Sequence, residues 1–418
     1  MPARTRTHYG GLIRAIAMTY QTSHFYRHIL LWALVSVGVL CCVAQEPALT
    51  QSADTSAICI EADSVAKPRK GFFNRIIDYF NDSNKPKEYK GFDFSIVGGP
   101  HYSSDTRLGV GLVAAGFYRN DLTDSITMPS NVSLYGDVST VGFYMVGVNG
   151  NHIFRGDRNR IEYGLYFYSF PRKFWGIGYE AGNDINHSTK FNEKFVEARV
   201  KYLHAIAPHL YIGPGAEFHY THAGKLREPS YWDGLALHST TYTAGVSVRY
   251  DSRDNLTATE RGVMVSFEQR FSPKFMGNRQ AYSSTEVAAT GYKNVWRGGV
   301  LAARLHGVWN FGNVPWPLMA TFGGSNSMRG YYQGRYRDKC ALDFTIELRQ
   351  HVWRRNGIVV WGGVGSVFPK MSAMRFDRLL PNGGVGYRWE FKKRTNVRLD
   401  FGIARRETAF IFSINEAF

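Results

Sequence analysis

Residues 342–349 read Leu-Asp-Phe-Thr-Ile-Glu-Leu-Arg, LDFTIELR. Apolar side chains alternate strictly with polar or charged ones, and a period of two places successive side chains on opposite faces of a β-strand. One face of this strand is therefore apolar and the other is charged. A soluble β-sandwich turns its polar face to water, whereas a transmembrane β-barrel turns its apolar face to lipid and its polar face to the lumen.

The same alternation recurs along the chain, for example at 92–97, 196–202 and 397–403. Most of the segments that carry it reach ten residues, which suits a tilted transmembrane strand of about 9–11 residues better than a sandwich strand of about 5–6. The fold prediction is all-β: a 16-stranded antiparallel transmembrane β-barrel over 91–418. The predicted strands are 91–98, 107–118, 131–138, 141–154, 158–168, 191–204, 209–221, 238–251, 260–271, 280–295, 299–312, 340–351, 357–367, 381–391, 395–404 and 409–418.

Two further expectations follow from this set of strands. The last strand runs to Phe418 and closes onto the first, because an open sheet edge is not tolerated in hydrocarbon. Four links after odd strands are long, at 169–190, 222–237, 313–339 and 368–380, whereas most links after even strands are short, such as 155–157 and 296–298. Outer-membrane barrels have long outer loops and short periplasmic turns, so the long links are expected outside the cell.

The N-terminus predicts export. Four arginines precede the apolar run ILLWALVSVGVLCCVA at 29–44, and no acid occurs before Glu46. This is the layout of a signal peptide, here 1–44, with a retained membrane anchor as the alternative. Residues 45–90 are predicted to be a periplasmic segment whose stretch 70–83 forms a short amphipathic helix. That helix either packs against its own protein or lies at the membrane interface.

Composition narrows the classes of function. The formal net charge is +16, and an exported basic chain meets anionic lipid head groups more readily than nucleic acid. Outside the predicted signal peptide the chain has two cysteines, Cys59 and Cys340, which are too few for a disulfide scaffold or a zinc site. Nothing has the spacing of a metal site or a nucleophile elbow. We therefore expect no enzyme, no metal and no cofactor.

The longest outer link contains GGSNSMRGYYQGRYRDK at 323–339. If this loop enters the lumen, Arg329 can meet a carboxylate on the next strand, because a guanidinium forms paired charge-assisted hydrogen bonds. Gly330 would allow a tight turn, and Tyr331 would pack against the wall. The alternative is a solvated basic loop.

This loop and the FTIELR that follows it resemble the outer-membrane assembly superfamily that includes BamA and TamA, also called bacterial surface antigens. The resemblance implies a loop folded inward between strands eleven and twelve, with Glu347 as the partner of Arg329. The lumenal loop motif would be Met328, Arg329, Gly330 and Tyr331. Other motifs that resemble the family are a turn with Asp251, Arg253 and Asp254, closing strands with Arg398, Asp400 and Gly402, and an insertion signal at Phe418.

The sequence departs from the family pattern in two places. Gly363 stands where the family usually has an aspartate on the thirteenth strand, so Glu347 is expected to hold Arg329 alone. The segment 45–90 is shorter than a typical domain and lacks a strand–helix–strand pattern, so the periplasmic POTRA domains of the family are expected to be absent.

The resemblance implies a role in inserting or translocating proteins, or lipids, at the bacterial outer membrane, in the family's manner or as an accessory. Partners would be outer-membrane lipids and lipopolysaccharide, and subunits or clients of an assembly machine. A weakly paired seam between 91–98 and 409–418 would template client strands. The alternative is a passive structural or channel-forming barrel without insertase activity.

Overall fold

The computed structural model describes residues 92–103, 107–119 and 127–418, which all belong to one compact unit, Asn84–Phe418. The predicted signal peptide at 1–44 and the predicted helix at 70–83 lie outside the described residues. The same holds for the expectation that no POTRA domain precedes the barrel. These three remain predictions.

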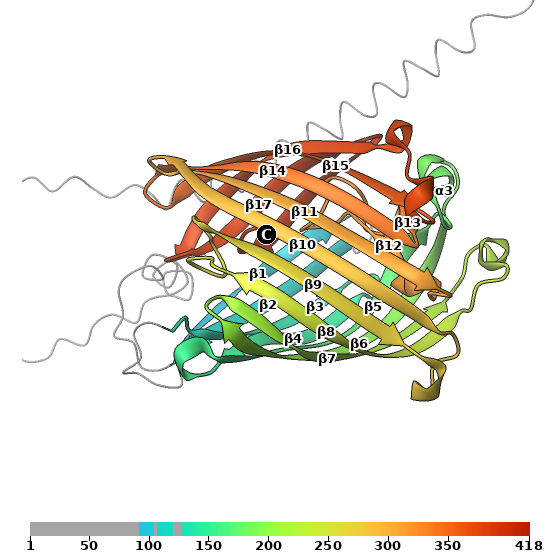
Figure 1. The fold of residues 1–418 in the computed structure, drawn as a ribbon. Helices are drawn as coiled ribbons and strands as arrows, with labels where there is room; N and C mark the ends of the chain where they lie inside the picture. Colours follow the sequence, from blue (N-terminus) through green and yellow to red (C-terminus); the bar gives the residue numbers. More distant parts are fainter. Residues whose placement is uncertain (1–91, 104–106, 120–126) are drawn as a thin grey trace, which may run out of the picture. The chain divides into compact units, whose positions relative to one another are not determined.

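Sixteen strands form one antiparallel sheet in which each strand pairs with the next along the chain, curved into a barrel (Figure 1). They are β1 (Phe92–Ser103), β2 (Arg107–Tyr118), β3 (Ser130–Ser139), β4 (Tyr144–Ile153), β5 (Asn159–Phe174), β6 (Thr189–Ala207), β7 (Leu210–Gly224), β8 (His238–Asp251), β9 (Gly262–Ser272), β10 (Tyr282–Trp296), β11 (Gly299–Gly312), β14 (Cys340–Trp353), β15 (Asn356–Phe368), β16 (Leu380–Lys392), β17 (Thr395–Ala404) and β18 (Glu407–Ile414).

The remaining elements are short and lie in the connections. They are the strands β12 (Ala320–Thr321) and β13 (Arg337–Asp338), the helix α3 (Tyr179–Asn183), and the 3-10 turns η1 (Arg155–Asp157), η2 (Pro229–Trp232), η3 (Lys274–Met276), η4 (Trp316–Leu318), η5 (Met371–Ala373) and η6 (Phe376–Arg378). Within the described ranges, no helix has the length and apolar character needed to cross a membrane.

The predicted sixteen strands and their order are confirmed. The largest differences are extensions at the end of the barrel that carries the long connections, called the long-loop end here. The hairpin of β5 and β6 continues in register to Phe174 and Thr189, beyond the predicted limits. The pairing of the two strands continues beyond the alternating sequence, since residues such as Pro171 and Arg172 still pair across the hairpin.

The two faces of the wall differ as the alternation predicts. On β14, Phe344 and Ile346 are 41% and 43% exposed on the outer face, whereas Asp343 and Glu347 are 2% and 1% exposed on the lumenal face. On β6, Val200 and Tyr202 are likewise exposed outside. An apolar outside and a charged inside match a membrane barrel and oppose a soluble sandwich.

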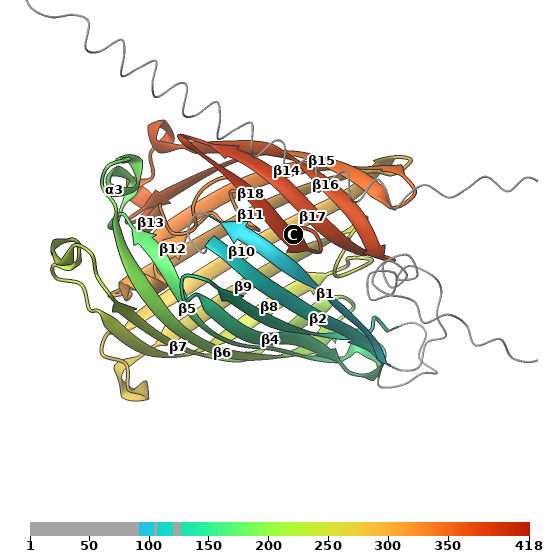
Figure 2. The same ribbon diagram turned by 180° about the vertical axis from the view of Figure 1, so that it is seen from behind.

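The expected closure of the barrel is not found. The sheet order starts at β1 and ends at β18, and no ladder joins these two strands in the described part of the chain (Figure 2). Two features weaken that edge. β1 contains Gly98, Gly99 and Pro100, which suit a strand poorly. β18 has only eight residues.

The prediction that the last strand runs through Phe418 is also wrong. β18 ends at Ile414, because Asn415 adopts φ 67° and turns the chain out of the strand. On β18 it is Phe410 and Phe412 that are exposed on the outer face.

The long-loop end is filled by apolar side chains from several connections. One cluster joins Tyr179, Phe322, Met328, Tyr331 and Tyr336. A second cluster stacks Phe174 on Trp232, with ring centroids 4.4 Å apart, and adds Phe191 and Trp316. The opposite end carries the short turns, such as residues 354–355 and 393–394, and is called the short-turn end.

A single charged substitution tests whether the outer face of the barrel contacts lipid. Ile346→Arg should destabilise the folded barrel by about 2–4 kcal/mol, because arginine near the middle of a lipid-facing strand loses hydration. The temperature at which the folded band disappears on a heat-modifiability gel should fall. Ser372→Arg, in the exposed loop between β15 and β16, should leave it unchanged. Equal effects from both changes would contradict the lipid-facing assignment.

Candidate functional site

The loop between β11 and β14 enters the lumen. Met328, Arg329 and Tyr331 are each 1% exposed. Short contacts hold the loop's shape: the N–H of Gly324 donates to the carbonyl of Tyr331 at 3.1 Å, and the N–H of Tyr331 donates to that of Met328 at 3.2 Å. The solvated-loop alternative is therefore excluded for this segment.

Arg329 lies between two carboxylates and over an aromatic ring. Its Nη2 contacts Glu347 Oε2 on β14, and its Nη1 donates to Asp400 Oδ2 on β17 at 2.7 Å. Its guanidinium carbon lies 3.7 Å from the ring centroid of Trp361 on β15. The side chains of Glu347 and Asp400 are fully buried. The expected contact of Arg329 with Glu347 is present.

The expectation that Glu347 holds Arg329 alone is wrong, because Asp400 supplies the second carboxylate. The thirteenth strand instead places Gly363 beside Asn382, whose Nδ2 donates to the carbonyl of Arg329 at 2.8 Å. The alternation of β17 could have revealed Asp400, since it shares the inward face of that strand with Arg398 and Gly402.

A close backbone approach makes room for the loop. Gly330 has φ 114°, which side chains other than glycine rarely allow. It packs on Gly402, where an added Cβ would lie 2.7 Å from the Gly330 nitrogen. The two glycines therefore let loop and wall touch through their backbones. This explains why Gly330 and Gly402 belong to one site.

Tyr331 fixes the loop on its other side. Its hydroxyl donates to the carbonyl of Pro381 at 2.8 Å and accepts from the N–H of Arg405 at 3.2 Å. Its ring packs against Phe322 and Tyr336. Burial raises the pKa of Tyr331 to about 12, so the hydroxyl stays a donor even in moderately alkaline solution.

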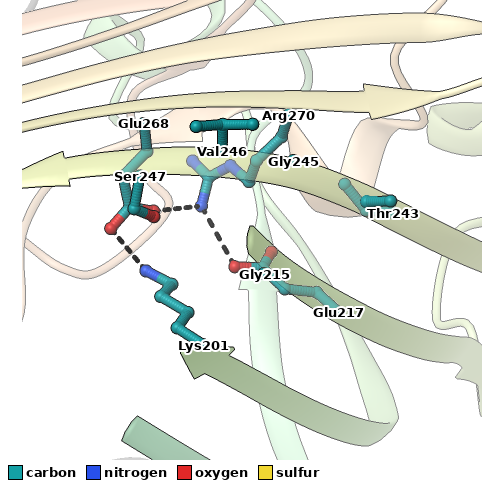
Figure 3. Close-up of a pocket in the computed structure, with 10 residues that line it drawn as sticks. Lys201, Gly215, Glu217, Thr243, Gly245, Val246, Ser247, Glu268 and Arg270 are labelled. Carbon is teal, nitrogen blue, oxygen red and sulfur yellow. Dashed lines mark hydrogen bonds and ion pairs between the residues drawn. The ribbon is translucent and has the colours of Figure 1, made fainter. Parts of the chain in front are cut away.

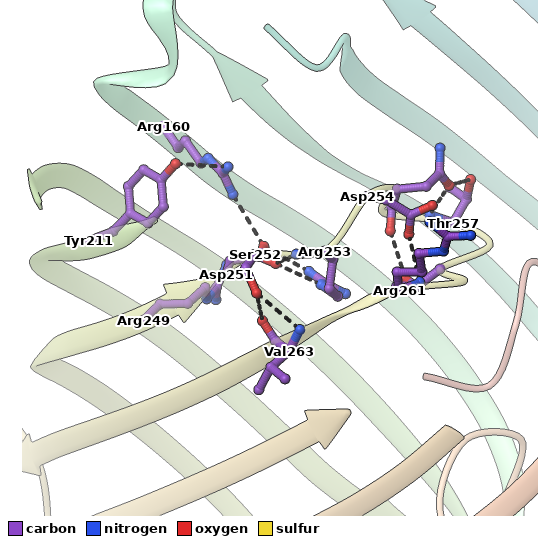
Figure 4. Close-up of polar contacts among 12 residues, drawn as sticks. Arg160, Tyr211, Arg249, Asp251, Ser252, Arg253, Asp254, Thr257, Arg261 and Val263 are labelled. Atoms are coloured by element: carbon purple, nitrogen blue, oxygen red, sulfur yellow. Dashed lines mark hydrogen bonds and ion pairs between the residues drawn. The ribbon is translucent and has the colours of Figure 1, made fainter. Parts of the chain in front are cut away.

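The predicted turn motif lies in the connection between β8 and β9, at the short-turn end (Figure 4). Asp251 accepts from Arg253 Nε at 2.8 Å and from Arg160 Nη1 at 3.4 Å. Asp254 Oδ1 accepts from the N–H groups of Glu260 and Arg261 at 3.0 and 3.2 Å. The structure thus brings Asp251, Arg253 and Asp254 into one turn between β8 and β9, separate from the loop.

A charged network on the lumenal wall was not predicted. Lys201 contacts Glu268, and Arg270 Nη1 lies 3.5 Å from Glu217 Oε1, on β6 to β9 (Figure 3). Arg270 Nη2 also donates to Glu286 Oε2 at 2.5 Å. The alternation marks the inward residues of each strand. Which of them pair across different strands depends on the register of the sheet, which the alternation does not give. This part of the lumenal wall is therefore lined by paired charges.

Phe418, predicted to be an insertion signal, contacts Arg349 on the lumenal side of the wall, and its role in insertion remains a prediction. Its carbonyl accepts from Arg349 Nη2 at 3.0 Å, and its ring centroid lies 5.4 Å from the guanidinium carbon of Arg349. Because Arg349 is a lumenal residue of β14, the segment after β18 turns into the lumen. Among the described residues, no group of three or more potential ligands could hold a metal ion.

These features define an outer-membrane β-barrel with a loop held inside its lumen by buried ion pairs. Residues 147–372, more than half of the chain, match the Omp85 superfamily domain, and the chain belongs to this superfamily. Its barrels reside in the bacterial outer membrane and are transporters or insertases rather than enzymes.

The solved structures that are similar to this chain include a BamA and a CdiB. BamA from Haemophilus ducreyi lacking POTRA domains 1–3 aligns with a TM-score of 0.50 and 12% identity, over 77% of this chain and 68% of that one. CdiB from Escherichia coli aligns with a TM-score of 0.51 and 9% identity, over 79% of this chain and 62% of that one. The chain thus spans less than two thirds of CdiB, and the likeness concerns the fold. Comparison with curated protein sequences gives no match.

Removing Arg329 should release the loop. Arg329→Ala leaves Glu347 and Asp400 buried without their shared partner, a loss of about 3 kcal/mol if the lumen is as dry as a protein interior. We expect new trypsin cleavage between residues 330 and 339 in the folded barrel. Arg375→Ala, which breaks an exposed pair with Asp377, should cause none. A loop that stays protected in Arg329→Ala would contradict the role of this arginine.

The turn between β8 and β9 should loosen in acid. Burial alone would raise the pKa of Asp254, but the N–H groups of Glu260 and Arg261 and the guanidinium of Arg394 outweigh it and hold this pKa below its usual range. Because the folded pKa is depressed, the stabilisation is present above the ordinary aspartate pKa of about 4 and is lost as the pH falls through the folded pKa.

Hydrogen exchange of the Glu260 and Arg261 amides measures this effect. In the wild type, protection should be constant from neutral pH to about pH 5 and should fall in stronger acid. Asp254→Asn should lower protection at neutral pH and remove that acid-dependent step. If the variant keeps both the protection and the step, another group controls the turn.

Proposed function

We propose that this protein takes part in inserting or translocating proteins, or lipids, at the outer membrane, directly or as an accessory to a larger assembly machine. The observation that carries the proposal is the seam between β1 and β18. The described residues form no ladder between these terminal strands of the sheet.

The seam has the physical properties of a site that receives a strand. Unpaired backbone N–H and C=O groups are costly in hydrocarbon, so a sheet edge at membrane depth favours pairing with another strand. Phe410 and Phe412 give β18 an apolar outer face beside that edge. A client strand would gain main-chain hydrogen bonds there, and its apolar side chains would face lipid.

The loop motif has a supporting role in this proposal. Through Arg329, the loop joins β14 to β17, which are not neighbours in the sheet. We propose that Met328, Arg329, Gly330 and Tyr331, with Glu347, stiffen this part of the wall. The seam could then open while the adjacent wall keeps its curvature.

The partners follow from this placement. Clients would be unfolded barrel proteins or lipids that reach the seam from the periplasm, and assembly-machine subunits would meet the short-turn end. Outer-membrane lipids and lipopolysaccharide would surround the barrel and meet the long-loop end. The alternative, a passive structural or channel barrel, needs neither clients nor an open edge. The loop within the lumen weighs against a wide open pore.

A photo-cross-linking amino acid at the seam separates these functions. Placed at Phe412 of β18, it should form adducts with newly exported barrel proteins in living cells. Placed at Phe344 of β14, which is also exposed to lipid but lies away from the seam, it should form none. Adducts with lipid alone at both sites, or equal protein adducts at both, would reject the seam as the client site.

A further inference from the structure

The four residues after β18 are tied to three parts of the lumenal wall at the short-turn end. The N–H of Asn415 donates to the carbonyl of Asn396 at 2.7 Å, and the N–H of Glu416 donates to that of Thr257 at 3.3 Å. The carbonyl of Phe418 accepts from Arg349. The segment 415–418 therefore has a defined place inside the lumen.

The carboxylate of Glu416 is the charged group of this segment. Its Oε2 accepts from Arg388 Nε on β16 at 2.8 Å and lies 3.8 Å from Arg349 Nε on β14. Its Oε1 accepts from Asn396 Nδ2 at 2.7 Å. The side chain is 4% exposed, so its charge is compensated by these groups rather than by bulk water.

The two arginines that bind Glu416 also bind the two acids that hold Arg329. Arg349 Nε donates to Glu347 Oε1 at 2.6 Å, and Arg388 Nη1 donates to Asp400 Oδ1 at 2.6 Å. The contacts close into a ring of alternating charge, in the order Arg329, Glu347, Arg349, Glu416, Arg388, Asp400 and back to Arg329.

We propose that Glu416 is a positioning residue for the loop, and that the ring couples the segment after β18 to the loop between β11 and β14. Without the Glu416 charge, Arg349 and Arg388 would be under-compensated and would draw Glu347 and Asp400 away from Arg329. Neighbouring Arg398, whose Nε lies 3.7 Å from Asp400 Oδ2, adds to this excess of positive charge. The coupling does not depend on whether the seam receives a client strand.

The coupling gives the end of β18 influence over a distant loop. Segment 415–418 follows the strand that borders the seam, whereas Phe322, Met328, Tyr331 and Tyr336 of the loop pack in the apolar cluster at the long-loop end. A movement of β18 that withdraws Glu416 would weaken the hold on Arg329. The seam strand and the loop would thus change conformation together.

The test uses the full-length barrel in outer-membrane vesicles. Glu416→Gln keeps the size and removes the charge, and trypsin cleavage between residues 329 and 339 should become about tenfold faster, as expected for coupled ion pairs. The matched control is Glu268→Gln, another buried lumenal acid with a lysine partner, which does not touch the loop. It should change the cleavage rate less than about twofold.

A double-mutant cycle distinguishes a ring from two local contacts. Glu347→Gln should also accelerate cleavage, and combining it with Glu416→Gln should add little, because both changes break the same unit. Multiplying effects, or equal acceleration by Glu268→Gln, would overturn the proposal. If Glu416→Gln does not assemble, Glu416→Asp should give an intermediate rate. A wild-type cleavage rate in Glu416→Gln, or in Glu416→Asp if only that variant assembles, would also overturn the proposal.

Discussion

The buried charge of Arg329 is the constraint on which the lumenal architecture depends. A guanidinium that leaves water must find compensation, and here Glu347 and Asp400 supply it from two strands that are not neighbours in the sheet. The arginine can reach both acids only because Gly330 and Gly402 let the loop backbone touch the wall. Trp361 covers the remaining face of the guanidinium. The position of the loop therefore depends on one ion-pair site and on the two glycines that give access to it.

The lumen as a whole is organised by charge pairing rather than by apolar packing. Pairs such as Lys201 with Glu268 and Arg304 with Asp343 join lumenal side chains of different strands. Apolar clusters are found near the long-loop end, where connections pack on one another. Each strand thus has a polar lumenal face and an apolar outer face. The period of two in the sequence reflects this difference between the faces.

The alternation in LDFTIELR and its counterparts was sufficient for the strands, their number and their inward faces, because the pattern is local. The alternation also placed Glu347 on the inward face of the strand that follows the loop, and the resemblance to the assembly superfamily named it as the partner of Arg329. Asp400 was recognised as part of a motif but not as the partner of Arg329, because that contact spans 71 residues and depends on wall curvature. The inward turn at Asn415 was missed because a single residue in a left-handed conformation leaves no periodic signal.

The position of Met328 tests the central claim most directly. A Met328→Cys variant in a background without Cys59 and Cys340 would be treated, in intact outer membranes, with a membrane-impermeant maleimide. Met328 is 1% exposed, whereas Met371 in the loop between β15 and β16 is 58% exposed. The account predicts that Met371→Cys reacts readily and that Met328→Cys reacts only after denaturation. Rapid labelling of Met328→Cys in the folded barrel would show that the loop is not buried in the lumen.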